Sequence, residues 1–284
     1  MKSGRKKKMI VLIIVLAAIV FVIWQNNCIT VTRSEFKNLR IPAEFDGLTI
    51  AHISDLHNKS FGRNQSRLLE RLADISPDII VVTGDLIDRR KYNLDIAMDF
   101  IEGALNIAPV FYVSGNHEAW SGEFSLIKER LEQAGVTVLD DAGYELFRQN
   151  SSILLLGLSD PDFLTNSYLQ GTDTSVMENQ LSKWDQYNKF KILLSHRPEL
   201  FDLYAVHNMD LIFAGHAHGG QFRLPFIGGL VAPDQGLFPK YTSGFHVKDN
   251  SAMYVSRGLG NSIIPVRVFN RPEIIVVTLR SEKP

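Results

Sequence analysis

Five short apolar segments of this chain each end at residues whose side chains commonly bind metal ions. The segments are four to six residues long, read as buried strands and cover 48–53, 78–83, 110–113, 190–194 and 210–213. Asp, His or Asn residues follow each of them: Asp55, His57, Asp85, Asp88, Asn116, His117, His196, His216 and His218. In open α/β sheets, ligands bind beyond the carboxyl ends of the strands. We therefore expect a sheet with a dense polar site at one rim.

Helical patterns alternate with these strands, as expected of an α/β fold. Helices are predicted over 65–75, 93–107, 123–134 and 173–189, a hairpin over 144–158, and further strands near 253–256 and 274–279. With 284 residues, 45% of them apolar, the chain can build a core that needs no disulfide. No internal repeat interrupts the pattern. We expect one catalytic domain over 36–284.

The amino-terminal 24 residues have the composition of a membrane element. Residues 1–8 are basic, and 9–24 form an unbroken apolar run that would span about 24 Å as a helix. This length lies a little below the ~30 Å hydrocarbon core of a bilayer, and Trp24 with the neighbouring lysines would extend it. No small-x-small cleavage site follows the run, which favours an uncleaved transmembrane signal anchor over a cleaved signal peptide or a buried core helix.

The same pattern predicts how the chain lies relative to the membrane. The positive-inside rule keeps the basic residues 1–8 in the cytoplasm as a short tail. Residues 25–35 are then expected to be a tether, and 36–284 a catalytic domain on the extracytoplasmic side. The expected location is therefore a single-pass protein of the cell membrane, with the lipid bilayer as its partner.

The near-neutral net charge of −1 hides an asymmetry. Five of the 30 basic residues lie in the first 28 positions, where there is no acidic residue, so the rest of the chain carries 25 basic and 31 acidic residues. Phosphate neutralisation needs clustered Lys and Arg, so general nucleic-acid binding is not expected. The single cysteine, Cys28, allows no disulfide within the chain.

The side chains at the strand ends suit divalent metal ions. Asp, Asn and His without Cys fit Mn²⁺, Fe²⁺ or Zn²⁺. Seven ligands from this set, identified below, are too many for one tetrahedral ion but suit two ions that share a bridging carboxylate. Two ions about 3.5–4 Å apart form the clamp used for in-line displacement at phosphorus, and an oxygen that bridges them becomes a hydroxide near neutral pH. The ligand set predicts a two-metal phosphoesterase.

Five motifs occur together along the chain: Asp55-Leu56-His57, Gly84-Asp85-Leu86-Ile87-Asp88, Gly115-Asn116-His117-Glu118, His196, and Gly215-His216-Ala217-His218-Gly219-Gly220-Gln221. In this order, over 49–221, they resemble the calcineurin-like metallophosphoesterase family. The Gly-Gly-Gln extension and Pro233-Asp234-Gln235-Gly236 resemble its bacterial membrane-anchored phosphodiesterase branch. The resemblance implies a four-layer α/β/β/α sandwich with two mixed sheets and a dinuclear metal site at the carboxyl-terminal rim of the strands.

The resemblance also implies which residues hold the ions. The first metal would be bound by Asp55, His57 and His218. The second metal would be bound by Asn116, His196 and His216, with Asp85 as the bridge. Three further histidines are expected to be structural or surface residues: His52, His207 and His246. Glu118 is left out of the site, as a residue that supports the ligands from behind or is merely polar.

Catalytic roles follow from the same resemblance. His117 is similar to the histidine of the family that protonates the leaving-group oxygen, and Asp88 would orient its imidazole. An arginine that touches phosphate in related phosphatases corresponds to Arg89. Arg90 and Arg197 are alternatives for this role, and each arginine is as compatible with a solvated loop.

Two functional hypotheses follow. The first is an enzyme that cleaves a phosphodiester or pyrophosphate bond, a preference that rests on the branch resemblance, with a phosphomonoesterase as its variant. The second is a membrane-tethered scaffold that keeps a metal centre without turnover. The substrate would be a small phosphoester, a nucleotide, a polymer or a lipid. An apolar wall for acyl chains, or alternatively core packing, is suggested by Phe222, Leu224, Pro225, Phe226, Ile227, Leu237, Phe238 and Pro239.

Overall fold

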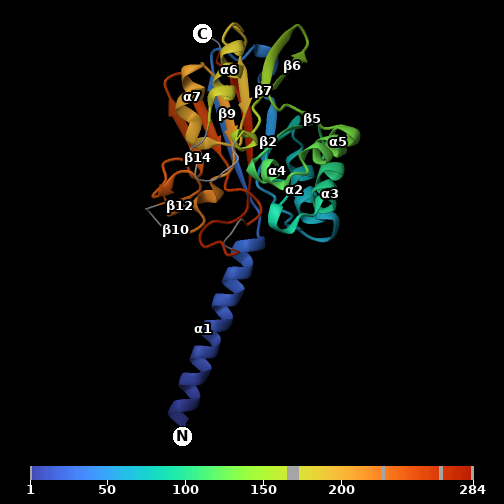
Figure 1. Ribbon diagram of the computed structural model, residues 1–284. Helices are drawn as coiled ribbons and strands as arrows, with labels where there is room; N and C mark the ends of the chain where they lie inside the picture. Colours follow the sequence, from blue (N-terminus) through green and yellow to red (C-terminus); the bar gives the residue numbers. More distant parts are fainter. Residues whose placement is uncertain (1, 165–172, 225–227, 262–264, 283–284) are drawn as a thin grey trace.

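The computed structural model describes residues 2–164, 173–224, 228–261 and 265–282. Within these ranges two six-stranded sheets, here called sheet A and sheet B, pack face to face and carry helices on their outer faces (Figure 1). Both sheets contain parallel and antiparallel pairs. The expected four-layer α/β/β/α sandwich with two mixed sheets is confirmed.

Sheet A joins strands from the two ends of the described chain. In spatial order its strands are β1 (Thr30–Asn38), β16 (Glu273–Ser281), β2 (Thr49–Ile53), β3 (Ile79–Thr83), β4 (Val110–Val113) and β5 (Thr137–Val138). Only the β16–β2 pair is antiparallel among these described strands. The outer face is covered by α2 (Ser66–Ile75), α3 (Leu94–Leu105) and α5 (Phe124–Ala134).

Sheet B has the spatial order β14 (Gly244–Lys248), β15 (Ser251–Val255), β9 (Leu211–Ala214), β8 (Lys191–Leu194), β7 (Ser151–Gly157) and β6 (Ala142–Arg148). Its outer face is covered by α6 (Ser175–Trp184) and α7 (Phe201–Val206). Helix α6 is shorter than the predicted 173–189, because Trp184 is the last residue of its buried face.

Residues alternate between two cores along the central strands, as the period of two in a strand requires. In β3, Val81 faces sheet B and packs in the same cluster as Ile192 and Phe213. Its neighbours Ile80 and Val82 face the helices on the other side. Both faces of these strands are therefore apolar, which explains their continuous runs of Val and Ile.

The parallel strands bring their carboxyl ends to one rim. Strands β2, β3 and β4 are parallel to one another, and so are β8 and β9. The loops that follow them carry the polar residues singled out in the sequence. The remaining elements lie in or beside these loops: α4 (Asn116–Ser121), β10 (Arg223–Leu224), β11 (Gly228–Gly229), β12 (Val231–Ala232) and β13 (Gly236–Leu237). Three residues of the proposed apolar wall, Pro225, Phe226 and Ile227, lie outside the described residues.

The amino-terminal helix α1 (Lys2–Asn27) projects away from the sandwich (Figure 1). Its segment Lys6–Asn27 is long and apolar enough, by length and composition, to cross a membrane. Most of its apolar side chains are exposed, including Ile14 and Val20. A core helix of a water-soluble domain would bury such residues.

The expectation of a tether over 25–35 is wrong for its second part. Residues 30–38 form β1, which pairs in parallel with β16 along all nine positions. Phe36 reaches the core between the sheets and is only 7% exposed. Helix α1 therefore connects to sheet A through two residues, Cys28 and Ile29.

Substitution of Phe36 tests whether β1 is packed as an integral strand of sheet A. Phe36→Ala removes a buried aromatic side chain and should lower the free energy of unfolding by about 3 kcal/mol. Lys37→Ala, at the exposed neighbouring position, should change it by less than about 0.5 kcal/mol. Denaturant unfolding of the detergent-solubilised full chain measures both. Equal effects of the two substitutions would contradict the placement of β1.

Candidate metal centre

The loops after β2 and β3 are hydrogen-bonded to each other. The backbone N–H of Asp55 donates to the carbonyl of Gly84 at 3.1 Å, and that of His57 donates to the carbonyl of Asp85 at 2.9 Å. Asp55 and His57 both have positive φ angles, +53° and +47°, an uncommon conformation for residues other than glycine. Such backbone strain persists where surrounding contacts hold it, and it is common at functional sites.

Asp85 lies at the centre of the polar residues. One carboxylate oxygen, Oδ1, accepts the backbone N–H of His117 at 2.8 Å. The other, Oδ2, is 3.4 Å from His57 Nε2 and 3.3 Å from His196 Nε2. Gly84 lets the loop after β3 lie against the loop after β4, because a Cβ at this position would lie 2.5 Å from the backbone nitrogen of Gly115. Asp85 therefore contacts residues from both sheets.

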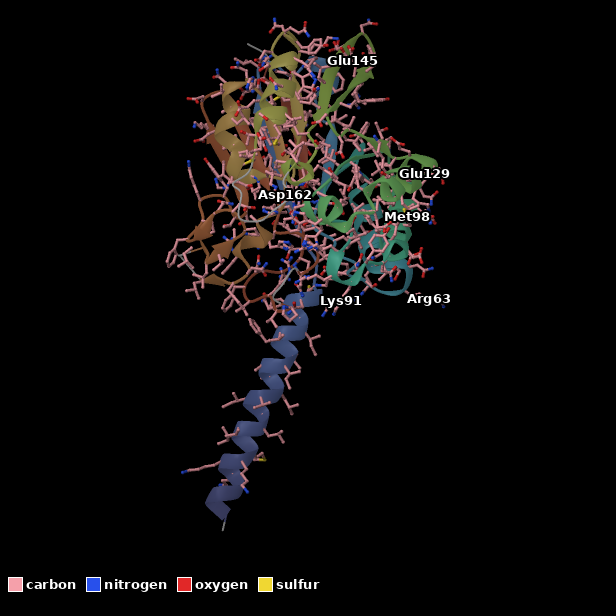
Figure 2. All side chains as sticks on the ribbon, in the orientation of Figure 1. Arg63, Lys91, Met98, Glu129, Glu145 and Asp162 are labelled. Atoms are coloured by element: carbon pink, nitrogen blue, oxygen red, sulfur yellow. The ribbon has the colours of Figure 1, made fainter. Side chains whose placement is uncertain are left out.

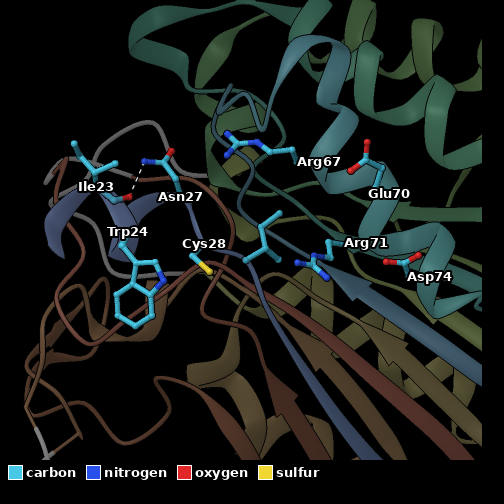
Figure 3. Close-up of a pocket in the computed structure, with 9 residues that line it drawn as sticks. Ile23, Trp24, Asn27, Cys28, Arg67, Glu70, Arg71 and Asp74 are labelled. Carbon is cyan, nitrogen blue, oxygen red and sulfur yellow. Dashed lines mark hydrogen bonds between the residues drawn. The ribbon is translucent and has the colours of Figure 1, made fainter. Parts of the chain in front are cut away.

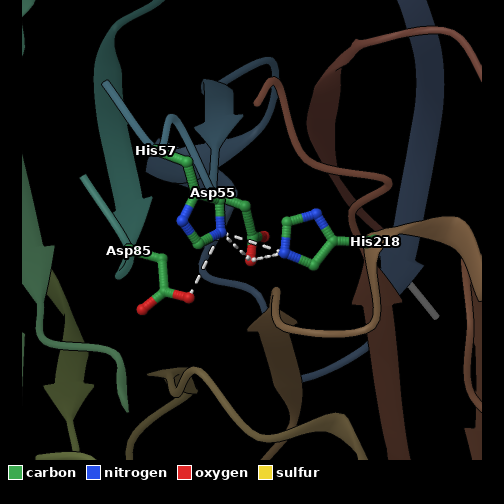
Figure 4. Close-up of side chains that lie close together, drawn as sticks. All are labelled: Asp55, His57, Asp85 and His218. Atoms are coloured by element: carbon green, nitrogen blue, oxygen red, sulfur yellow. Dashed lines mark hydrogen bonds and ion pairs between the residues drawn. The ribbon is translucent and has the colours of Figure 1, made fainter. Parts of the chain in front are cut away.

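A first group of ligand atoms surrounds one side of Asp85 (Figure 4). His57 Nε2 lies 3.0 Å from His218 Nε2, and His218 Nε2 lies 3.3 Å from Asp55 Oδ1. The Asp55 carboxylate also accepts the backbone N–H of His216, at 3.1 and 3.2 Å. Asp55, His57, Asp85 and His218 are all buried and offer ligand atoms close enough to hold one ion.

A second group lies on the other side of Asp85. His196 Nε2 is 3.0 Å from Asn116 Oδ1 and 3.1 Å from His216 Nδ1. Asp85, His196 and His216 again place one ligand atom each within reach of a single ion. The two groups share Asp85, and together they include all seven residues for which the sequence predicts metal binding.

Hydrogen bonds on the outer side determine which imidazole nitrogens face the second group. His196 Nδ1 lies 2.7 Å from the carbonyl oxygen of Thr83, which can only accept, so Nδ1 carries the hydrogen. His216 Nε2 lies 2.9 Å from a carboxylate oxygen of Asp234 and 3.2 Å from Nη1 of Arg197, so these two residues hold the outer side of its ring. In a neutral His196 the inward nitrogen, Nε2, has the lone pair, and an outer hydrogen bond of this kind is typical of metal-binding histidines. In the first group, Nδ1 of His57 and Nδ1 of His218 have no partner among the described residues.

The electrostatics of the buried residues also suit cations. Burial lowers the pKa of His57 to about 3 and that of His216 to about 4, so both imidazoles are neutral at pH 7, the form that binds metal. Burial opposes a charged His196 too, but Asp85 outweighs it and raises the pKa of His196 to about 10. A proton on His196 occupies the place that a bound cation would take between His196 and Asp85. The residues present therefore fit two divalent ions that share Asp85.

His117 lies at the edge of this centre. Its ring centroid is 4.4 Å from that of His57, and its Nδ1 accepts the backbone N–H of Arg89 at 3.2 Å. Asp88 was expected to orient His117, but its Oδ1 is 3.6 Å from His117 Nδ1, beyond hydrogen-bond distance. Asp88 instead accepts three hydrogen bonds from Arg90. The backbone of Arg89 is therefore what orients His117 in this structure.

The arginine side chains lie differently from one another. The guanidinium of Arg89 stacks on the ring of Trp120 at 4.4 Å, and that ring is 5.8 Å from His117. Arg197 is buried: it forms a bidentate pair with Asp160 at 2.7 Å and contacts Asp234 at 2.6 Å. Arg197 thus supports the carboxylate that holds His216. These contacts assign it a role inside the protein rather than in a solvated loop.

Glu118 is the residue that sequence reasoning left out of the site. Its Oε2 accepts the backbone N–H groups of Asp85 at 2.7 Å and Gly115 at 2.8 Å, and its Oε1 accepts that of Ile87 at 3.2 Å. It is completely buried. Glu118 therefore ties the loop after β3 to the start of α4. Its position directly after Asn116 and His117 was the available signal.

The expected structural histidines lie away from the two groups. His52 is buried between the sheets, where Nε2 is 2.8 Å from Thr83 Oγ1 and the ring is 5.1 Å from that of Phe213. His207 pairs with Asp185 at the end of α7. His246 lies in β14 against Tyr241.

Comparison with known proteins agrees with this geometry. The calcineurin-like phosphoesterase family model matches residues 48–220. The metallophosphoesterase YkuE of Bacillus subtilis is 31% identical over 89% of this chain and 86% of its own length. Phosphodiesterase YaeI of Escherichia coli is 28% identical over 81% of this chain and 81% of its own length. The UDP-2,3-diacylglucosamine pyrophosphatase LpxG of Chlamydia muridarum is 26% identical over 90% of this chain and 92% of its own.

Solved structures resemble the chain in fold. TT1561 of Thermus thermophilus superposes with a TM-score of 0.52 at 14% identity, over 75% of this chain and 90% of its own. The family match covers the segment that carries the two ligand groups. The chain belongs to the calcineurin-like phosphoesterase family, whose members are metal-dependent phosphoric ester hydrolases.

Proposed function

We propose that this chain hydrolyses phosphodiester or pyrophosphate bonds with two divalent ions, which would be Mn²⁺, Fe²⁺ or Zn²⁺. The observation that carries the proposal is the convergence of two buried ligand groups on the shared carboxylate of Asp85. The printed names of two relatives, a phosphodiesterase and a pyrophosphatase, support diester or pyrophosphate substrates. When bound, the ions would activate water and neutralise the phosphoryl oxygens.

The proposal gives each ligand a role. Asp55, His57 and His218 would hold one ion, and Asn116, His196 and His216 the other, with Asp85 between them. The outer hydrogen bonds of His196 and His216 keep their rings in the binding orientation.

His117 is proposed to supply a proton to the leaving-group oxygen. Because its Nδ1 accepts a hydrogen bond from Arg89, its Nε2 carries the ring hydrogen. Burial lowers the pKa of His117, and the carboxylates of Asp85 and Asp88 act in the opposite direction. Asp88 would thus favour the charged form of His117 through its field. Arg89, stacked on Trp120 beside His117, is the proposed contact for the substrate phosphate.

The anchor belongs to the same proposal. We take α1 as a single membrane span, with the basic residues 1–8 in the cytoplasm and the catalytic domain on the extracytoplasmic side. The apolar length of Lys6–Asn27 and the positive-inside rule support this arrangement. The substrate would be a small or lipid-linked phosphoester that is present there.

Metal dependence is the first test. Purified full chain in detergent, stripped of metal, should hydrolyse bis-p-nitrophenyl phosphate only after Mn²⁺, Fe²⁺ or Zn²⁺ is restored, and should prefer it to p-nitrophenyl phosphate. Asp85→Asn removes the negative charge of the shared carboxylate and should lower kcat/KM by roughly a thousandfold, about 4 kcal/mol. His246→Asn, away from the centre, is the control.

The other outcomes separate the alternatives. Activity with the monoester alone would indicate a phosphomonoesterase. Stoichiometric metal without hydrolysis of either ester would support the scaffold. Hydrolysis that is unchanged in Asp85→Asn would contradict the two-metal proposal itself.

The role of His117 predicts a dependence on the leaving group. His117→Ala should lower kcat about 10²- to 10⁴-fold for a diester of an alkyl alcohol, because that leaving group needs a proton. The loss should be much smaller for a p-nitrophenyl leaving group, which departs as an anion. Metal content, measured by atomic emission, should stay at the wild-type level. An equal loss for both leaving groups would rule out proton donation by His117.

The hydrogen bonds of Glu118 predict that two substitutions at this position lower the free energy of unfolding by different amounts. Glu118→Ala leaves three buried N–H groups without an acceptor and should lower the free energy of unfolding by at least about 3 kcal/mol. Glu118→Gln keeps one oxygen for Asp85 and Gly115, so it should cost less. Thermal unfolding of the two variants, with and without Mn²⁺, provides the comparison. Equal midpoints for Ala and Gln would show that Glu118 does not tie the two loops together.

A further inference from the structure

The last turn of α1 is part of the catalytic domain. Gln25 and Asn26 are buried, with exposed fractions of 4% and 8%. Gln25 Oε1 accepts the backbone N–H of Asn270 at 3.2 Å, and Asn26 Oδ1 accepts that of Arg267 at 3.2 Å. The ammonium of Lys59, in the loop after β2, donates to the carbonyl of Asn26. These contacts fix the direction of α1 relative to the sandwich.

Aromatic contacts continue this joint toward the apolar span. The ring of Phe21 lies 5.6 Å from that of Phe269, and the guanidinium of Arg271 lies 4.8 Å from the ring of Trp24. Trp and Arg side chains are typical of the level at which a membrane helix leaves the hydrocarbon. The segment that contains Phe269 and Arg271 therefore lies at the depth of the lipid headgroups if α1 spans the bilayer.

Strand directions place the metal centre at this same end. β1 starts at Thr30, three residues after α1 ends, and Thr30 is paired with Glu273 at the start of β16. β16 is antiparallel to β2, and His52 near the carboxyl end of β2 is paired with Ile275. The carboxyl end of β2 and the start of β1 thus lie at the same end of sheet A along the strand direction (Figure 1). Asp55 and the rest of the centre face the side from which α1 emerges.

A direct contact links the joint to the centre. Asn270 Nδ2 donates to the backbone carbonyl of His218 at 2.7 Å, while the backbone N–H of Asn270 donates to Gln25. One residue therefore contacts both α1 and the loop that carries a proposed metal ligand. Gly219 makes this possible, because a Cβ there would overlap the amide of Asn270.

Exposed apolar side chains surround the joint. We call them the apolar face, and the exposed fractions are 73% for Leu237, 69% for Phe238, 52% for Phe269, 44% for Val231 and 42% for Leu224. Backbone hydrogen bonds connect their segments to one another: Arg223 to Val268, Leu230 to Phe222, and Phe238 to Leu230. Strands β10 and β12, which carry Leu224 and Val231, lie at the end of the domain from which α1 projects (Figure 1).

Polar and basic side chains lie at the end of the domain from which α1 projects, where they could contact lipid headgroups. Figure 2 places Lys91 near the end of α1, Arg63 at the same end of the domain but farther from the helix, and Glu145 at the opposite end. A cavity of about 570 Å³ beside α1 is lined by Trp24 and Cys28 and by two basic and two acidic side chains, Arg67, Arg71, Glu70 and Asp74 (Figure 3). An apolar face flanked by basic side chains is the pattern of a surface that rests in the interfacial layer of a bilayer.

We propose that the apolar face rests in the surface of the bilayer that α1 spans, so that the metal centre opens onto the membrane and receives its phosphoester at headgroup depth. The inference rests on the proposed function for the identity of the centre and for the span of α1. It adds the orientation of the domain and the substrate class, an amphiphile whose phosphate lies at the membrane surface.

Depth measurement tests the orientation without relying on activity. The full chain with Cys28→Ser receives a single nitroxide-labelled cysteine at Phe238 or, as the matched control, at Phe147, which is 71% exposed in β6 at the far end of the domain. In proteoliposomes, relaxation by oxygen should exceed that by a water-soluble nickel chelate at 238 and not at 147. Preferential relaxation by the nickel chelate at both positions would overturn the proposal.

Activity on two substrates provides the second test. A double variant, Leu237→Ser with Phe238→Ser, should hydrolyse a vesicle-embedded hexadecyl p-nitrophenyl phosphate about 10- to 100-fold more slowly than the wild type, since two large apolar contacts with the bilayer are lost. Its rate with soluble bis-p-nitrophenyl phosphate should be unchanged, and Phe147→Ser should affect neither rate.

Equal rates of the double variant and the wild type on vesicles would contradict the apolar face while leaving the proposed function intact. A wild type that hydrolyses neither ester would contradict the proposed function. In that case the nitroxide depths still decide the orientation, because they do not depend on turnover.

Discussion

Asp85 brings a negative charge to the place where the rims of the two sheets meet, and much of the surrounding structure compensates for that charge. An isolated buried carboxylate costs several kcal/mol unless it is paired and hydrogen-bonded. Burial alone would raise its pKa, but His196 and His117 hold the pKa of Asp85 well below its usual range. The backbone N–H of His117 and the carboxylate of Glu118 then fix the loops around it. Two shared cations would complete this compensation.

The fold and the ligand groups were largely predictable because both depend on local patterns. A continuous run such as 78–83 indicates a strand that is buried on both faces, and its carboxyl end must open at a sheet rim. The convergence of Asp55, His57, Asp85 and His218 follows from that rule. The roles of these residues as metal ligands remain a prediction.

Other features depend on long-range contacts that a sequence pattern does not specify. The first part of β1 was expected to belong to a tether. It pairs with β16, some 240 residues away, and only this partner strand makes it part of the sheet. Glu118 acts on backbone N–H groups, which every residue has, so its partners leave no trace in the sequence. The partners of Arg197 are likewise distant: Asp160 precedes it and Asp234 follows it by 37 residues each.

The joint between α1 and the domain changes how the anchor is understood. A flexible tether would let the centre face any direction, whereas Gln25 and Asn26 fix one. Because the connection is already rigid, no further conformational entropy is lost when the domain meets the membrane. This arrangement favours substrates that are themselves confined to the membrane surface. Asn270 is the residue through which the anchor and the loop of His218 are held together.

Anomalous diffraction from crystals of the Mn²⁺-loaded protein tests the central claim most directly. Two manganese peaks per chain are predicted, one bound by Asp55, His57 and His218 and the other by Asn116, His196 and His216. Each peak should lie within roughly 2.0–2.3 Å of an Asp85 carboxylate oxygen. A single peak, or two peaks that do not share Asp85, would contradict the account.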